Sequence, residues 1–368
     1  MSDFALMYVH GQRFNARSLQ YDSDDLPENG EELQPDAERQ SIYVHNLNSW
    51  AVCALLCTVP AHEIGVLRPA LYNHLAGGTN IIVKSPPGNP PVYQLAFHLP
   101  YYAWRSTTTP RLGAKLEGGD TNMSEAIPAK SLDVSFLAPT KGEKAFMHFA
   151  QVSCVVTGVD RLISTVYMFV ENEFDDEDSV EHIEQLRNEA DYSVTYDPLT
   201  RGMLDADQPV ADPEALFVLL LRIRMDQINN EYSQIIGKLA KSFENYGPLL
   251  TDTHYSLPPT DSYRPSQETA LQWVDKISVV LESLRDRLDP LVEAIEGFEK
   301  EFHVEIRSLS EYTDKHHQRL PNEFGAVLKE LSSSSILLEK MAKRSQAIAE
   351  RVRIPSQPEP LSMLLTHH

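Results

Sequence analysis

The sequence predicts an α+β protein in which an N-terminal α/β domain is followed by long helices that form a coiled coil or a helical hairpin. Two observations indicate this class. From Ser41 to about Phe174 the chain alternates short apolar runs with turns that contain Pro and Gly, a pattern typical of strands and short helices. From about Gln267 to Val352 the apolar residues recur at heptad spacing, which predicts helices with one apolar stripe.

The change of pattern along the chain predicts six segments. They are an acidic mobile segment (1–40), an α/β domain (41–193), a connector with a long helix (194–245), a Pro-rich linker (246–266), a heptad helical region (267–353) and a disordered tail (354–368).

Within the α/β domain, the helices and strands follow from local signals. Helices are predicted over Trp50–Thr58 and Pro60–Leu75, the second with Pro at its opening and Glu63 in its first turn. Strands are predicted over Asn80–Lys84, Val92–Leu99, Leu132–Leu137 and Phe146–Thr157. Gly158–Val170 is apolar throughout and fits a strand or a buried helix, of which we favour the helix.

The C-terminal half is dominated by helical periodicity. Ala215–Phe243 is predicted as one long helix, which the linker Tyr246–Pro265 separates from the heptad region. We define the heptad seam as the candidate interaction surface formed by Leu281, Leu284, Leu288, Leu291, Ile295, Phe298 and Phe302. Pro290 predicts a kink or short break within it, and Pro321 a second break.

A weaker second seam follows the break at Pro321. It comprises Val327, Leu331, Leu338, Met341, Ile348 and Val352, with Ser334 and Ser345 at the intervening positions. The heptad seam must pack on this helix or on a second copy of the chain, because an exposed stripe of that length favours association. The sequence slightly favours pairing within the chain.

Composition limits the partners and the compartment. The formal net charge of −21 and the lack of a large basic patch exclude a nucleic-acid surface. The longest apolar candidates, Trp50–Ala61 and Ala215–Ile223, fall short of the roughly 18 to 20 residues of a membrane helix. No signal peptide is visible. Cys53, Cys57 and Cys154 lie in apolar stretches and are predicted to be buried free thiols in a reducing compartment, so we expect a soluble, cytoplasmic protein.

The chain carries no motif that specifies a chemistry. His62-Glu63 begins like a zinc-protease motif, but Val66 stands where the second histidine is needed. Cys53 and Cys57 could bind a metal with His62, although a core role is favoured. The acidic run Asp175, Asp176, Glu177, Asp178 and Glu181 lacks EF-hand spacing and predicts a solvated face. Asp205 and Asp207, in a loop, could be a pair of acid/base carboxylates, an alternative that the sequence does not favour. We therefore expect no catalytic residue, metal or cofactor.

Several phrases resemble a set of filamentous-fungal proteins related to the CorA-type divalent-cation transporter superfamily. They are Phe97–Arg105 (FHLPYYAWR), Gln151–Gly158 (QVSCVVTG), Asp197–Gly202 (DPLTRG) and Leu204–Asp207 (LDAD). The resemblance implies an α/β domain followed by long helices. This chain departs from the superfamily because it lacks the two membrane helices and the Gly-Met-Asn pore signature; Leu204 follows Gly202-Met203. No pore residue is carried over.

The sequence therefore favours an interaction or scaffolding protein over an enzyme, with a protein partner or a second copy bound through the heptad helices. The alternatives are an enzyme or accessory protein of a fungal biosynthetic pathway, and a soluble cation sensor that uses the acidic run.

Overall fold

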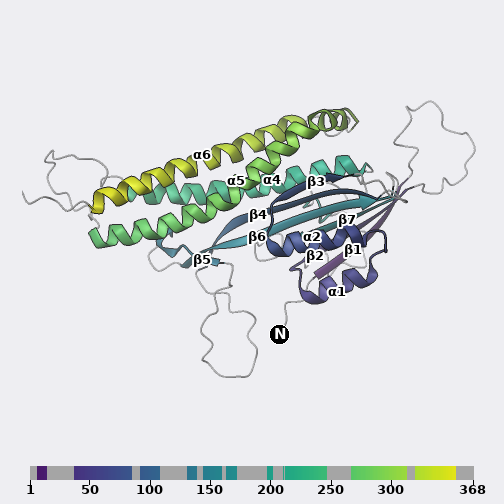
Figure 1. The fold of residues 1–368 in the computed structure, drawn as a ribbon, viewed down its shortest axis with the longest axis horizontal. Coiled ribbons are helices and arrows are strands. Elements are labelled where there is room, and N and C mark those ends of the chain that lie inside the picture. The colour runs from purple at the N-terminus through teal and green to yellow at the C-terminus, as the bar shows by residue number, and fades with distance from the viewer. Residues whose placement is uncertain are drawn as a thin grey trace, which may run out of the picture.

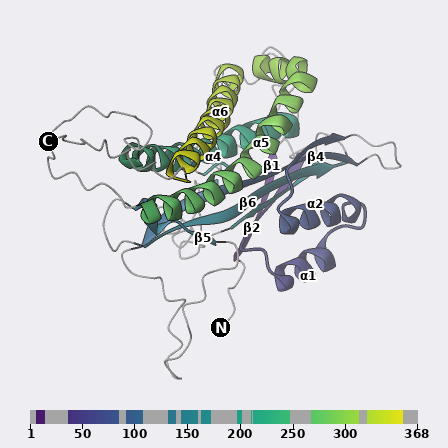
Figure 2. The same cartoon turned by 60° about the vertical axis from the view of Figure 1, so that its left-hand side comes forward.

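The computed structural model describes the parts of the chain that form one sheet and the helices on both of its faces. The described residues are 6–14, 37–84, 92–107, 131–138, 144–159, 163–171, 197–201, 210, 212–246, 267–312 and 320–353. Three layers are visible in Figure 1: helices α4, α5 and α6 on one face of the sheet, the sheet itself, and helices α1 and α2 on the other face. Figure 2 shows the same order of layers from a second direction. The predicted α+β class is confirmed.

Seven strands form the sheet in the part of the chain that is described. They are β1 (Leu6–Phe14), β2 (Ala37–His45), β3 (Asn80–Lys84), β4 (Tyr93–Thr107), β5 (Ser131–Asp133), β6 (Lys144–Gly158) and β7 (Ile163–Val170). Their order is β1-β2-β7-β6-β4-β3, with β5 beside β6, and a short 3-10 helix, η2 (Ser135–Leu137), follows β5. β2 and β7 run parallel, whereas the other pairs are antiparallel.

Both faces of the central strands are apolar because both are covered. On β7, Val166, Met168 and Val170 belong to the core under α4 and α5, whereas Tyr167 and Phe169 belong to a second core under α1 and α2. This alternation follows from the two-residue period of a strand. It also explains why the helix favoured for Gly158–Val170 is wrong: a strand buried on both faces reads as a continuous apolar run.

The two short helices follow the predictions closely. α1 (Ser49–Thr58) begins at Asn48, whose side chain accepts a hydrogen bond from the Ala51 N–H. α2 (Ile64–Ala76) begins later than predicted, because Pro60–Glu63 forms a turn. It ends at Gly77, whose φ of 68° is the left-handed conformation that favours glycine.

The C-terminal helices form one layer. α4 (Pro213–Tyr246) directly follows Asp212, whose carboxylate accepts from the Glu214 N–H. α5 (Gln267–Tyr312) and α6 (Leu320–Arg353) run antiparallel. Two hydrogen bonds show this direction: Ser278 bonds to Ser345, and the later Asp289 accepts from the earlier Ser335. Pro321 is the second residue of α6, and the residues between α5 and α6, 313–319, lie outside the described part. Pro290 lies inside α5, which continues on both sides of it.

The heptad seam is buried within the chain. Leu281, Leu284, Leu288, Leu291, Ile295 and Phe298 belong to one core, and the side chain of Phe302 lies outside the described part. The residues that cover the seam come from α6, α4 and β4, including Leu331, Leu338 and Phe217, whose ring lies 6.1 Å from that of Phe298. Ser345, an interruption of the second seam, is buried with Ser278 as its hydroxyl partner.

One N-terminal prediction needs correction. β1 and the first residues of β2 lie within the segment 1–40, which was expected to be mobile. β1 pairs with β2, and β2 pairs with β7, so these residues extend the sheet rather than precede it. The linker 246–266, apart from Tyr246, and the tail 354–368 lie outside the described residues.

We expect Gly158→Ala to lower the free energy of unfolding by at least about 2 kcal/mol. Gly158 ends β6, and a Cβ there would lie 2.2 Å from the Ile163 carbonyl oxygen and 2.9 Å from the Tyr93 hydroxyl. The backbone must therefore move. Gly237→Ala is a matched control, since a Cβ at this helical position meets nothing within 4 Å, and alanine should stabilise the helix slightly. Urea unfolding of both variants measures the difference, and equal midpoints would contradict the expected clash.

Candidate functional site

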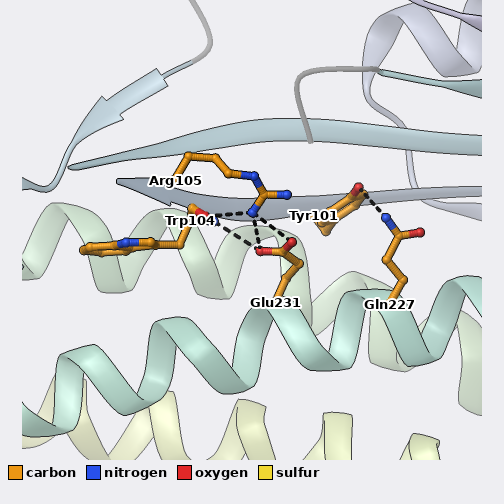
Figure 3. A network of polar contacts seen from close by, with 5 residues as sticks. All are labelled: Tyr101, Trp104, Arg105, Gln227 and Glu231. Atoms are coloured by element: carbon orange, nitrogen blue, oxygen red, sulfur yellow. Dashed lines mark hydrogen bonds and ion pairs between the residues drawn. The ribbon is translucent and has the colours of Figure 1, made fainter. Parts of the chain in front are cut away.

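A row of polar side chains on α4 faces the sheet. Arg224, Gln227 and Glu231 are buried at spacings of three and four residues, which place them on one side of a helix. Gln227 and Glu231 have their partners on β4 (Figure 3). Arg224 donates to the turn 197–200. Because buried polar groups cost free energy unless they are hydrogen-bonded, this row is a candidate functional site.

Arg105 and Glu231 form the centre of this network. The Arg105 Nη1 donates to both carboxylate oxygens of Glu231, at 2.9 and 3.1 Å, and to the Trp104 carbonyl at 2.7 Å. The Trp104 N–H donates to the same carboxylate at 3.2 Å. Among the described strands, β3 pairs with β4 only as far as His98. The Glu231 carboxylate therefore satisfies a backbone donor on a part of β4 that β3 does not reach.

The network extends along α4 toward the turn 197–200. The Gln227 Nε2 lies 3.5 Å from the Tyr101 hydroxyl, and its Oε1 accepts from Arg224 at 2.9 Å. Arg224 also donates to the Leu199 carbonyl at 3.4 Å. At the other end, the Lys238 Nζ lies 4.7 Å from the centroid of the Trp104 ring. These contacts join α4 to the sheet and to the turn.

The geometry of this network fits a structural clamp better than a reaction centre. The carboxylate of Glu231 already accepts from a guanidinium and a backbone N–H, so it is poorly placed to accept a proton from a substrate.

We expect Glu231→Leu to lower the free energy of unfolding by about 1–3 kcal/mol. The substitution leaves the Trp104 N–H and the Arg105 guanidinium without their carboxylate, although Arg105 keeps some access to solvent. Asp226→Asn, which breaks the more exposed pair with Arg222 on the same helix, should cost at most about 0.5 kcal/mol. Urea unfolding compares the two, and a double-mutant cycle with Arg105→Met isolates the coupling. Equal costs for the two variants would contradict the clamp.

A second polar cluster lies between α2 and the sheet. The Ser153 hydroxyl is 2.9 Å from the His74 Nδ1 and 2.8 Å from the His98 Nδ1, and all three residues are buried. A hydroxyl has one proton, so when both rings are neutral one imidazole must donate to it. The His98 Nε2 has no partner among the described residues. We assign the proton of His98 to Nδ1, because an orphaned acceptor costs less than an orphaned N–H.

Burial lowers the pKa of His98 to about 4. The ring is therefore neutral near pH 7. Ser153 has no exposed surface, and no carboxylate is among its described hydrogen-bond partners. The cluster consequently lacks the access and the acidic member that a serine nucleophile requires.

The third cluster ties the start of α2 to β7. The buried Glu63 carboxylate accepts from the Thr165 hydroxyl at 3.0 Å and from the Tyr167 hydroxyl at 2.6 Å. Burial, then the hydrogen bond to Glu63, raises the pKa of Tyr167 and keeps it a donor. Glu63 also lies at the N-terminus of α2, where a carboxylate is favourable.

On the outside of the molecule, α1 presents an apolar surface. We define the α1 face as Trp50, Cys53, Ala54 and Cys57, which are exposed at the spacing of one helix side. Trp50 is 79% exposed, whereas only Ala51 and Leu55 of α1 are buried. No charged residue occurs from Asn46 to Ala61. Exposed apolar surface without charge is typical of a binding surface.

The structure shows where the three cysteines and the candidate metal ligands lie. Cys154 is buried as expected, but Cys53 and Cys57 are exposed, so that part of the prediction is wrong. They are exposed because α1 buries only one narrow side. The acidic run Asp175–Glu181, with Asp205 and Asp207, lies outside the described residues. Among the described residues, no three His, Cys, Asp or Glu side chains are placed to hold one metal ion.

Sequence reasoning missed the clamp and the serine–histidine cluster. Glu231 lies in a predicted helix, but its partner Arg105 is 126 positions away. The available signal was the spacing of Arg224, Gln227 and Glu231 among apolar neighbours on one helix. His98 and Ser153 face each other because β4 and β6 pair in that register.

Comparison with known proteins does not assign the chain to a family. No family model matches the chain, and no curated protein matches its sequence. Among solved structures, it is similar to the cytoplasmic domain of ZntB from Vibrio parahaemolyticus, with a TM-score of 0.40 and 10% identity over 87% of each chain. Similarity at this level does not establish a shared function. No helix in the described part of this chain is long and apolar enough to cross a membrane.

Proposed function

We propose that the chain is a non-catalytic protein-interaction module that binds a protein partner through the α1 face. The observation that carries this proposal is the exposure of Trp50, at 79%, on a helix without charge. Burying an exposed tryptophan is among the strongest single contributions to a protein interface. A scaffolding role through the heptad helices, as the sequence favours, would have to use their outer residues, because the described seam residues are buried within the chain.

The position of α1 supports this choice. The helix lies at the periphery, beside α2 and away from α4–α6 (Figures 1 and 2). The polar clusters, in contrast, are buried and make internal contacts. Tyr72 and Leu75 on α2 are also more than half exposed, and they could extend the contact.

Site-specific photocrosslinking tests the proposal. A photoreactive phenylalanine derivative replaces Trp50 in cells that produce the chain, and the same residue replaces Val279 as a control. Val279 is 52% exposed on α5, a helix that lies on the opposite face of the sheet from α1 (Figure 1). We expect an adduct of defined mass at position 50 that is absent at position 279 and is lost when Cys53 and Ala54 are both replaced by Glu. Adducts at neither position, or equally at both, would rule out α1 as a specific surface.

A ligand screen separates this proposal from the enzyme and cation-sensor alternatives. A binding module of this kind should show no rise in melting temperature with Ca²⁺, Mg²⁺ or common nucleotide and redox cofactors. A saturable rise of several degrees with one of them would favour an alternative.

We also propose a cytoplasmic location, supported by three cysteines without a disulfide, two of them exposed. Fractionation followed by a carbonate wash tests it. Retention in the membrane pellet after the wash would contradict a soluble protein.

A further inference from the structure

Cys53 and Cys57 form an exposed thiol pair on α1. They lie four residues apart, about one helical turn, and both are free thiols. Cys154 is also free, but it is buried in β6. Residues at this spacing have Cβ atoms about 5–6 Å apart on the same side of a helix. Both thiol side chains therefore lie on one exposed side of α1.

This spacing disfavours a disulfide but suits a bridging metal ion. A disulfide needs Cβ atoms about 3.5–4.5 Å apart, so it would distort the helix. Two sulfur atoms that share one ion are separated by up to about 4.6 Å, twice a metal–thiolate bond of about 2.3 Å in zinc sites. Rotation about the side-chain bonds of two cysteines at helical spacing covers that separation.

The number of protein ligands available at the pair indicates which metal ion it could bind. His62, considered as a third ligand from the sequence, lies beyond the end of α1, and its Nε2 is 3.6 Å from the Glu63 carboxylate. No three potential ligands gather among the described residues. Structural zinc sites use four protein ligands. Soft thiolates favour Cu(I), a closed-shell monovalent ion that is stable with two sulfur ligands in a line.

We propose that Cys53 and Cys57 form a two-thiolate site for a soft monovalent cation of the Cu(I) class. Binding replaces the two thiol protons, which pass to the solvent, and changes no oxidation state. Affinity should therefore fall as the pH is lowered. This inference does not rest on the proposed protein interaction, because the isolated chain can be titrated without a partner.

Trp50 provides an optical signal for the site. It lies three residues before Cys53 on the same side of α1, and it is exposed, whereas Trp104 and Trp273 are buried. The fluorescence that a soluble quencher such as the caesium ion can reach therefore comes mainly from Trp50. We expect an ion bound at the thiol pair to change this accessible emission and leave the remainder unchanged.

A titration with Cu(I), held by a competing chromogenic chelator without oxygen, tests the proposal. We expect one ion per reduced wild-type chain, the same stoichiometry for Cys154→Ala, and a loss of affinity on the order of a hundredfold or more for Cys53→Ser and for Cys57→Ser. Zn²⁺ should bind much more weakly. Circular dichroism checks that all three substitutions, two exposed and one buried, keep the fold.

Three outcomes of this titration would contradict the proposed two-thiolate site. Binding that persists in the double serine variant would place the ion elsewhere. Unchanged affinity in either single variant would show that one thiol suffices, and no uptake by fully reduced wild-type chain would exclude the site. A failed photocrosslink at Trp50 would leave this titration unaffected, so the two proposals fail separately.

Discussion

Replacing Leu284 by Asp is expected to lower the free energy of unfolding by on the order of 4 kcal/mol or more and to reduce the helical signal of a monomeric chain. Leu284 is fully buried in the core that α4, α5, α6 and β4 share. A carboxylate there would lose its hydration without a partner. Circular dichroism, urea unfolding and sedimentation measure the effect.

Val279→Asp is the matched control. Val279 lies on the same helix but is 52% exposed, so its carboxylate stays hydrated and should change stability by no more than about 0.5 kcal/mol. If the wild type sedimented as a dimer and Leu284→Asp as a folded monomer, the heptad seam would join two copies. A Leu284→Asp chain as stable as wild type would contradict the packing of α5 altogether.

Lowering the pH is expected to destabilise the fold through His98. Its pKa falls from 6.5 to about 4 on burial. Below pH 6.5 the His98 imidazole therefore binds a proton in the unfolded chain but stays neutral in the folded chain. Stability attributable to His98 is complete above pH 6.5 and declines by up to about 1.4 kcal/mol per pH unit until about pH 4, or about 3 kcal/mol in total.

His98→Gln tests this linkage. Glutamine can still hydrogen-bond Ser153 but does not titrate. We expect lower stability than wild type at pH 7.5 and a shallower decline between pH 6.5 and 4.5, measured as the urea midpoint at each pH. Parallel pH profiles for the two chains would show that His98 does not carry the linkage.

The sequence predicted the elements whose signals are local. β3 begins and ends where expected, and the heptad spacing identified the buried stripe of α5. β7 was mistaken for a helix because its two partners and both covering layers cannot be seen in an apolar run. The exposure of Cys53 and Cys57 could not be predicted for a similar reason: α1 is almost uniformly apolar, so its sequence does not indicate which side packs.

The parallel pairing of β2 with β7 also has a kinetic consequence. Arg39 on β2 pairs with Ser164 on β7. During synthesis, β2 therefore cannot form this pairing until the much later β7 has been made. α4, which packs on one face of the sheet, begins only at Pro213 and is synthesised later than all of the strands. Such distant contacts slow folding and leave apolar strands uncovered while the chain emerges at about 5–20 residues per second. The yield of folded protein should therefore depend on the lifetime of this uncovered sheet, and so on chaperones and temperature during synthesis, more than on the stability of the final state.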